Sequence, residues 1–286
     1  MNVSTLALSK VADLDISAAS GLVLRGGELY AIADDELFAA VFDVHGKLLR
    51  RVELLPGELP GEHKERKRRK PDFEALASMP DGRLLALGSG STPARTRSVC
   101  FDPALRRAHA MSDWSPLYEE LSRSLPELNI EGVAVQAGRL WLAQRGNGAA
   151  GQNACIELDL DVVHVALDEA RSITARALVA IHPVVLGSID GAPLSLTDLT
   201  PHPTAGLVFS AAAEPSGSTY DDAPTTGSVI GVMDARGVIG CELRVMPVCK
   251  LEGIALSSDA STLWLVADPD DRSQRAPLFR LAWPFG

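Results

Sequence analysis

Five segments of the chain repeat one pattern, and this repetition limits the fold more than any other feature of the sequence. Each segment holds an apolar run, a turn rich in Gly, Pro or Asp, and a second run that begins at a leucine. Two β-rich runs around such a turn predict a hairpin, and a hairpin repeated at long intervals is typical of a β-propeller. Near the start of each first run stands a polar anchor residue: Ser20, Glu74, Glu131, Asp198 and Glu252.

The spacing of the anchors predicts the number of blades. They lie 54, 57, 67 and 54 residues apart, room for four antiparallel strands in each repeat. The last repeat is about one strand short, and the N-terminal "STLALSKVADL" can supply that strand and close the ring without an open edge. We therefore expect an all-β, five-bladed propeller in one domain, residues 1–286. A six-bladed ring stays open if the 67-residue interval hides an irregular blade.

One segment has a helical rather than a β pattern. In "SPLYEELSRSLPELN", Ser115 is a plausible N-cap, Pro116 suits the first helical position, and the pattern stops before Pro126. We expect one short helix inserted between the second and third blades.

Composition excludes several classes of protein. The formal net charge of −10 argues against nucleic-acid binding, which needs a basic surface. No run approaches the ~20 apolar residues of a membrane span, and the N-terminus does not resemble a secretory signal. The four cysteines show neither a CxxC pair nor zinc spacing. We expect a cytoplasmic monomer without a membrane partner.

The anchors form a candidate metal site. The first strand of each propeller blade lines the central channel, so its starting residues should gather at one end of the axis. Carboxylates that converge there raise one another's pKa, and a Ca²⁺ ion, which accepts ~6–8 oxygen ligands, relieves the repulsion. The alternative is that each carboxylate accepts backbone N–H groups at a water-filled mouth. The expected ligands are Glu74, Glu131, Asp198 and Glu252, with Ser20 as a weaker one.

The loops after the second strands should lie on the same face, because each second strand returns to the end where the first one starts. Arg145 is the best candidate there for contact with an anion. The basic run "HKERKRRK" enters this face as well. A solvated loop is its simpler interpretation, and a role in anion binding is the alternative. The full set of candidate ligand-binding residues is Arg145, Arg95, Arg97, Lys70, Gln144, Asp34, Glu214 and Asp268.

Common catalytic motifs are missing from the sequence. "GNGAAG" satisfies G-x-G-x-x-G, but a strand pattern follows it where a dinucleotide site needs a helix. There is neither a G-x-S-x-G elbow nor an HExxH motif. No residue identifies itself as a general base.

The strand starts "IEGVAV" and "LEGIAL" resemble those of the esterase-like phytase and SdiA-regulated propellers. The ring of one Ser, three Glu and one Asp is similar to that of the calcium-activated nucleotidases (apyrases). These resemblances imply axial calcium bound by the anchors. We therefore expect a metal-dependent hydrolase of an anionic small molecule, a phosphoester or related ester. The rivals are a non-catalytic ligand- or protein-binding propeller with a structural cation, and a metal-free scaffold.

Overall fold

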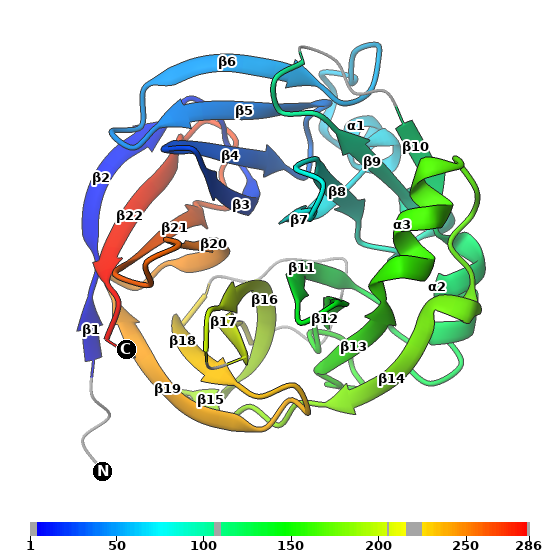
Figure 1. The fold of residues 1–286 in the computed structure, drawn as a ribbon. Coiled ribbons are helices and arrows are strands. Elements are labelled where there is room, and N and C mark those ends of the chain that lie inside the picture. Colours follow the sequence, from blue (N-terminus) through cyan, green and yellow to red (C-terminus); the bar gives the residue numbers. More distant parts are fainter. Residues whose placement is uncertain (1–4, 106–109, 205, 216–224, 285–286) are drawn as a thin grey trace.

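The computed structural model, which describes residues 5–105, 110–204, 206–215 and 225–284, places five β-sheets around a central axis (Figure 1). The five-bladed propeller predicted from the repeats is confirmed. Blades 1 to 3 each contain four antiparallel strands in chain order. Blade 1 holds β3 (Ala19–Arg25), β4 (Glu28–Ala33), β5 (Phe38–Asp43) and β6 (Leu48–Glu53); blade 2 holds β7 (Phe73–Ser78), β8 (Leu84–Gly88), β9 (Arg97–Phe101) and β10 (Ala110–Asp113); blade 3 holds β11 (Ile130–Gln136), β12 (Arg139–Gln144), β13 (Ala154–Asp159) and β14 (Leu178–Pro183).

The fourth and fifth blades complete the ring with help from the N-terminus. Blade 4 holds β16 (Ala192–His202), β17 (Gly206–Ala213), β18 (Gly227–Met233) and β19 (Ile239–Met246), extended by the short β15 (Ser188–Ile189) and β1 (Thr5–Ala7). Blade 5 holds β20 (Lys250–Leu256), β21 (Thr262–Asp268), β22 (Ala276–Ala282) and β2 (Ser9–Leu14).

The N-terminal strand closes the last blade, as predicted. Strand β2 pairs antiparallel with β22, from Ser9 opposite Arg280 to Leu14 opposite Ala276. In Figure 1 the two strands lie side by side although they come from opposite ends of the chain. The preceding β1 adds to β19 of blade 4 in parallel. The N-terminal segment therefore ties blade 5 to blade 4.

The hydrophobic core is divided among the blade interfaces. Five clusters of buried side chains occur, one between each pair of neighbouring blades. The cluster between blades 1 and 2 contains Val41 and Leu84, for example, and the one between blades 5 and 1 contains Leu22 and Val266. Because the inner strands are covered on both faces, buried residues occupy consecutive rather than alternate positions in them.

Three α-helices decorate the ring where one was expected. Helix α2 (Ser115–Leu121) lies between blades 2 and 3 as predicted, although Ser115 is its first residue and Trp114 takes the cap position. Helix α3 (Leu160–Asp168), inserted between β13 and β14, accounts for the long interval between anchors, so the alternative of a sixth blade is wrong. Two 3₁₀ turns, Pro93–Arg95 and Ala175–Ala177, complete the helical elements of the described residues.

The basic run forms helix α1 (His63–Arg69), not a solvated loop. The Glu62 side chain caps it by accepting hydrogen bonds from the backbone N–H groups of Lys64 and Glu65. A carboxylate at this position also interacts favourably with the helix dipole. The local capping signal therefore outweighs the mutual repulsion of the basic side chains.

No helix in the described part of the chain combines the length and the apolar character that a membrane crossing requires.

Candidate functional site

The inner strands of the blades bulge at the anchor residues. The pairing register shifts between Phe73 and Ala75, between Ile130 and Gly132, and between Leu251 and Gly253, so the glutamate inside each gap has no cross-strand partner. A bulge of this kind changes the direction of the extra side chain. Glu74, Glu131 and Glu252 all line one small cavity of about 70 Å³ at the end of the axis, which we call the axial mouth, and Ser20 lines it as well.

Asp198 is offset from this ring by one position. In blade 4 the register shifts between Leu196 and Asp198, so Thr197 occupies the bulge. Asp198 is fully buried, and its two carboxylate oxygens accept hydrogen bonds from the backbone N–H groups of Leu199 and Ile254, each at 2.8 Å. Four of the five expected metal ligands therefore line the axial mouth. The Asp198 carboxylate instead joins β16 to β20 by accepting hydrogen bonds from backbone N–H groups.

Small residues after the anchors let the inner strands approach closely. A Cβ atom on Gly132 would lie 2.7 Å from the backbone N of Leu199, and one on Gly253 would lie 2.9 Å from the backbone O of Ser20. Real Cβ atoms are not found so near a neighbouring backbone. Glycine is therefore required where one inner strand packs against the next.

Arginine and lysine side chains neutralise much of the ring. Arg145 contacts Glu131 at 3.3 Å and Glu214 at 2.5 Å. Lys250 contacts Glu252 at 3.1 Å and Glu214 at 3.4 Å. All five side chains are at least nine-tenths buried. An anion at Arg145 would therefore have to compete with carboxylates that are already in place.

A second group of ion pairs joins blades 1 and 2. Lys70 forms ion pairs with Asp34 and with Asp72, the latter at 2.8 Å. Arg95 contacts Asp72 at 2.9 Å, and the Ser89 hydroxyl donates a hydrogen bond to Asp72 at 2.5 Å. Because charged groups are stable in a buried site only when paired and hydrogen-bonded, this network has a fixed geometry.

Carboxylates remain in excess at the mouth. Six line it against five cationic side chains, and Glu74 has no cation in ion-pair contact among the described residues. Burial, reinforced by the charge of Glu131, raises the pKa of Glu74 well above its ordinary value. Burial also raises the pKa of Glu252 to about 8 and that of Asp268 to about 7, although Lys250 opposes both shifts.

Three carboxylates meet the first requirement of a cation site. Oxygen atoms of Asp34, Asp72 and Glu74 lie within 4.8 Å of one another, and carboxylate oxygens are the ligands that Ca²⁺ prefers. The Lys70 ammonium group already contacts Asp34 and Asp72. These residues therefore fit a divalent cation on the condition that Lys70 moves aside.

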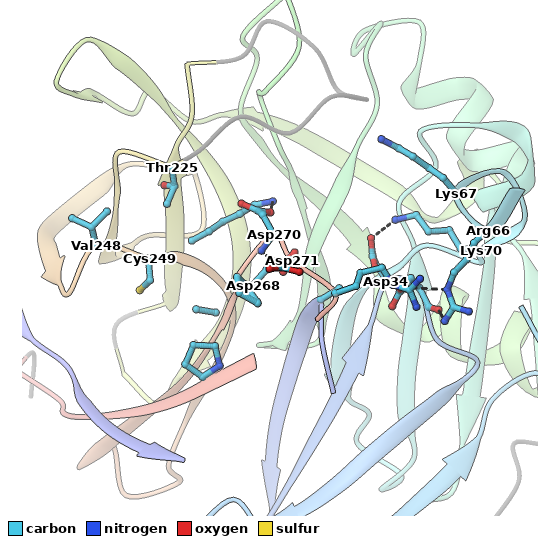
Figure 2. Close-up of a pocket in the computed structure, with 17 residues that line it drawn as sticks. Asp34, Arg66, Lys67, Lys70, Thr225, Val248, Cys249, Asp268, Asp270 and Asp271 are labelled. Atoms are coloured by element: carbon cyan, nitrogen blue, oxygen red, sulfur yellow. Dashed lines mark hydrogen bonds and ion pairs between the residues drawn. The ribbon is translucent and has the colours of Figure 1, made fainter. Parts of the chain in front are cut away.

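A larger cavity of about 690 Å³ opens beside the axial mouth (Figure 2). It lies between α1, the start of β20 and the loop after β21. Five side chains line both this cavity and the mouth, so that the two spaces share a charged boundary: Asp34, Lys67, Lys70, Lys250 and Asp268.

Three of the expected ligand-binding residues line neither space: Arg97, Gln144 and Glu214. Arg97 is exposed on β9, where its guanidinium contacts the sulfur of Met111 at 3.7 Å. Gln144 uses its side-chain amide on the backbone of Asn129, Glu127 and Arg145, which fixes the loops rather than a ligand. The other five line the mouth: Arg95, Arg145, Lys70, Asp34 and Asp268. Glu214 contacts two of the cations that line it, Arg145 and Lys250.

Sequence reasoning missed three polar residues of the mouth: Asp72, Asn129 and Lys250. Each stands two positions before an anchor glutamate, at or just before the start of an inner strand. Asn129 donates a hydrogen bond to Glu131 at 2.6 Å, and Lys250 pairs with Glu252. The recurrence of a polar residue two positions before each anchor glutamate was therefore the signal that could have found them.

These features define a five-bladed propeller with a charged axial mouth and an adjoining cavity. The chain belongs to a family of unknown function (DUF6929), whose model matches residues 15–282. No curated protein matches the sequence.

Solved structures with the same fold are distant in sequence. The glutaminyl cyclase of Myxococcus xanthus is 12% identical, with a TM-score of 0.58 over 98% of this chain and 97% of that one. A luciferin-regenerating enzyme is 10% identical, with a TM-score of 0.52 over 98% and 95% of the two chains. Similarity at this level establishes the propeller fold alone, and the specific likeness to phytase-like and apyrase propellers stays a prediction.

Proposed function

We propose that this protein is a metal-dependent hydrolase that binds a small ester in the large cavity and acts on it at the axial mouth. The observation that carries the proposal is the boundary shared by the two spaces, because a molecule in the cavity meets Asp34, Lys70, Lys250 and Asp268 at one end. Both similar structures bear the names of enzymes, which supports a catalytic use of such a ring.

Asp268 is the residue best suited to move a proton. It lies at the end of β21 and borders both spaces. One carboxylate oxygen accepts the backbone N–H of Asp270 at 2.9 Å, and no cation forms an ion pair with Asp268 among the described residues. Burial raises its pKa to about 7, and a group that titrates near the working pH is the most effective general acid or base.

Glu74, Asp72 and Asp34 would hold the metal ion, which we propose to be Ca²⁺. When bound, such an ion polarises an ester oxygen and lowers the pKa of a bound water. Lys70 competes with it, since the same two aspartates that contact the ammonium group supply the oxygen ligands. Lys250 and Arg145 hold Glu252 and Glu131 in position beside this group.

The calcium proposal is tested by thermal unfolding with and without Ca²⁺, because a ligand that binds only the folded state raises the midpoint. We expect millimolar Ca²⁺ to raise the midpoint of the wild type, Glu74→Gln to remove that rise, and Lys70→Met to enlarge it. Asp271→Asn is the matched control, since Asp271 lines the cavity but bonds to Ser273 and Gln274. Equal responses of the wild type and the Glu74 and Lys70 variants would show that no cation binds there.

The hydrolase proposal is tested by a screen of phosphoesters, nucleotides, lactones and carboxylic esters, each with added Ca²⁺ and with a chelator. Removal of a general acid or base costs roughly 10²–10⁴-fold in rate, so we expect Asp268→Asn to lose at least 100-fold and Asp271→Asn to keep its activity. If no ester is turned over although Ca²⁺ binds, the second candidate is favoured, a ligand-binding propeller with a structural cation. The ion pairs that already occupy Arg145 and Lys250 are consistent with such a structural role.

A further inference from the structure

The large cavity has two unlike walls. One wall is apolar and comes from the segment before β20 and from blade 5, where it includes Val248, Cys249 and Pro277. Val248 is 47% exposed although it is a large aliphatic side chain. Figure 2 shows Val248 and Cys249 on one side of the space and Arg66 and Lys70 on the other, with Asp268 between them. A ligand that fills this space meets an apolar surface at one end and charges at the other.

The cationic groups of the charged wall already have partners. Arg66 and Arg272 both contact the Asp35 carboxylate, at 3.3 and 2.6 Å. Lys70 and Lys250 contact the carboxylates of the mouth, and Lys67 likewise has an interaction partner. An anionic ligand would have to break one of these contacts before it gained another.

The spare groups of the cavity are carboxylate oxygens. Asp268 makes no ion pair among the described residues, and Oδ1 of the buried Asp35 has no hydrogen-bond partner. A buried or half-buried carboxylate without a cation is unfavourable, and a positively charged ligand group removes that penalty. Carboxylates and cationic side chains are equal in number in the cavity lining, but among the described residues the groups that lack a partner are acceptors.

We infer that the cavity binds an amphipathic molecule with a positively charged amine at one end, its amine against Asp268 and its apolar part against Val248 and Cys249. The inference rests on the proposed function in taking this cavity as the substrate site. It reverses the sign of the charge expected from the sequence for the substrate: the ligand end at the mouth is cationic, not anionic.

Cys249 is a convenient reporter of occupancy. It is half-buried in the cavity wall, Cys100 and Cys155 are buried, and Cys241 is exposed. In a Cys241→Ser background, alkylation by N-ethylmaleimide therefore reports on Cys249, and peptide mass spectrometry confirms the position. Octylamine, octanoate and 1-octanol are the probes, because they share a chain length and differ in the charge of the head group.

At pH 8.5, where Asp268 is ionised, we expect octylamine to slow the alkylation of Cys249 at least fivefold at a concentration at which octanoate has no effect. Octanol should protect less well than octylamine. Asp268→Asn should remove the advantage of octylamine over octanol, and Asp271→Asn should retain it. Protection by octanoate equal to or better than that by octylamine, or no protection by any of the three probes, overturns the inference.

A second pair of variants tests the apolar wall. Val248→Asp should reduce the protection by octylamine, whereas Val238→Asp, at a 60% exposed position outside the cavity lining, should leave it unchanged; equal effects of both variants would overturn this part. For each variant, the alkylation rate with probe is divided by the rate without probe, so that changes in thiol reactivity cancel.

Protection from alkylation can be measured whether or not the protein turns over a substrate. If octylamine protects Cys249 but no ester is hydrolysed, the inference holds and the hydrolase proposal fails. If an ester is hydrolysed but octylamine does not protect Cys249, the hydrolase proposal holds and the inference fails.

Discussion

Asp268 combines partial burial with the lack of a cationic partner, and this combination makes its ionisation unfavourable in the folded protein. Its pKa is raised to about 7 from 3.8, so between these values the folded state binds more protons than the unfolded chain. Stability then falls as the pH rises through this window. The free energy of unfolding of Asp268→Asn should therefore exceed that of the wild type by a margin that grows by on the order of 2 kcal/mol between pH 5 and pH 8.5.

Denaturant unfolding at the two pH values measures this difference. Asp271→Asn is the control, because hydrogen bonds from Gln274 and Ser273 lower the pKa of Asp271 in the folded protein, so that this carboxylate is ionised in both states at pH 5 and at pH 8.5. A pH dependence identical in the wild type and in the Asp268 variant would show that Asp268 ionises normally.

Some residues of the site were predictable from sequence and others were not, for reasons that lie in the strand geometry. Glu74, Glu131 and Glu252 recur beside a small residue at the start of an apolar run, which gives them a common position. In "LTDLTP" both Thr197 and Asp198 are polar, so composition cannot show which one takes the bulge; the pairing register decides it. The ion pairs of Arg145 and Glu214, which are 69 residues apart in the chain, depend on blade packing and leave no local signal.

Among the elements, α1 shows how a local pattern can mislead. A run of basic residues is usually a solvated segment, yet Arg66 turns inward from this helix. Its guanidinium contacts the carboxylates of Asp35 and Glu36 at 3.3 and 3.2 Å and donates to the backbone O of Asp35 at 2.5 Å. The helix is thereby fixed over the cavity, and the next residue after it, Lys70, reaches the axial mouth.

Arg66 contacts the buried Asp35, whereas Arg69 of the same helix pairs only with the exposed Glu65. This difference predicts unequal effects of removing the two arginines. Arg66→Ala leaves Asp35 with Arg272 alone and should reduce the free energy of unfolding by about 1–3 kcal/mol, the usual loss for a broken buried hydrogen bond to a charged group. Arg69→Ala removes only an exposed pair with Glu65 and should change it by less than about 0.5 kcal/mol. Thermal or urea unfolding measures both, and equal losses would mean that α1 is not anchored by Arg66.

At the scale of the whole molecule, the ring distributes the core over five interfaces, so no blade buries its apolar faces alone. The number of blades followed from the spacing of the hairpins, because a repeat of near-constant length is a property of the sequence itself. Helix α3 did not follow, since the interval that contains it was equally consistent with an irregular blade. The position of a site at one end of the axis then follows from the topology: every inner strand starts at the same end.

Closure of the ring by the N-terminal segment leads to the last prediction. A chain that starts at Leu8 lacks β1, a three-residue addition to the outer edge of blade 4, and should unfold only a few degrees below the full chain. A chain that starts at Asp15 also lacks β2, which exposes the edge of β22 and removes the fully buried Leu14 from the interface of blades 5 and 1. Loss of several kcal/mol at that interface corresponds to a fall of roughly 10 °C or more for a domain of this size, and the open strand edge should promote aggregation. Calorimetry and light scattering on the two truncated proteins measure these effects. Equal unfolding temperatures would show that blade 5 is stable without β2 and that the ring does not depend on this closure.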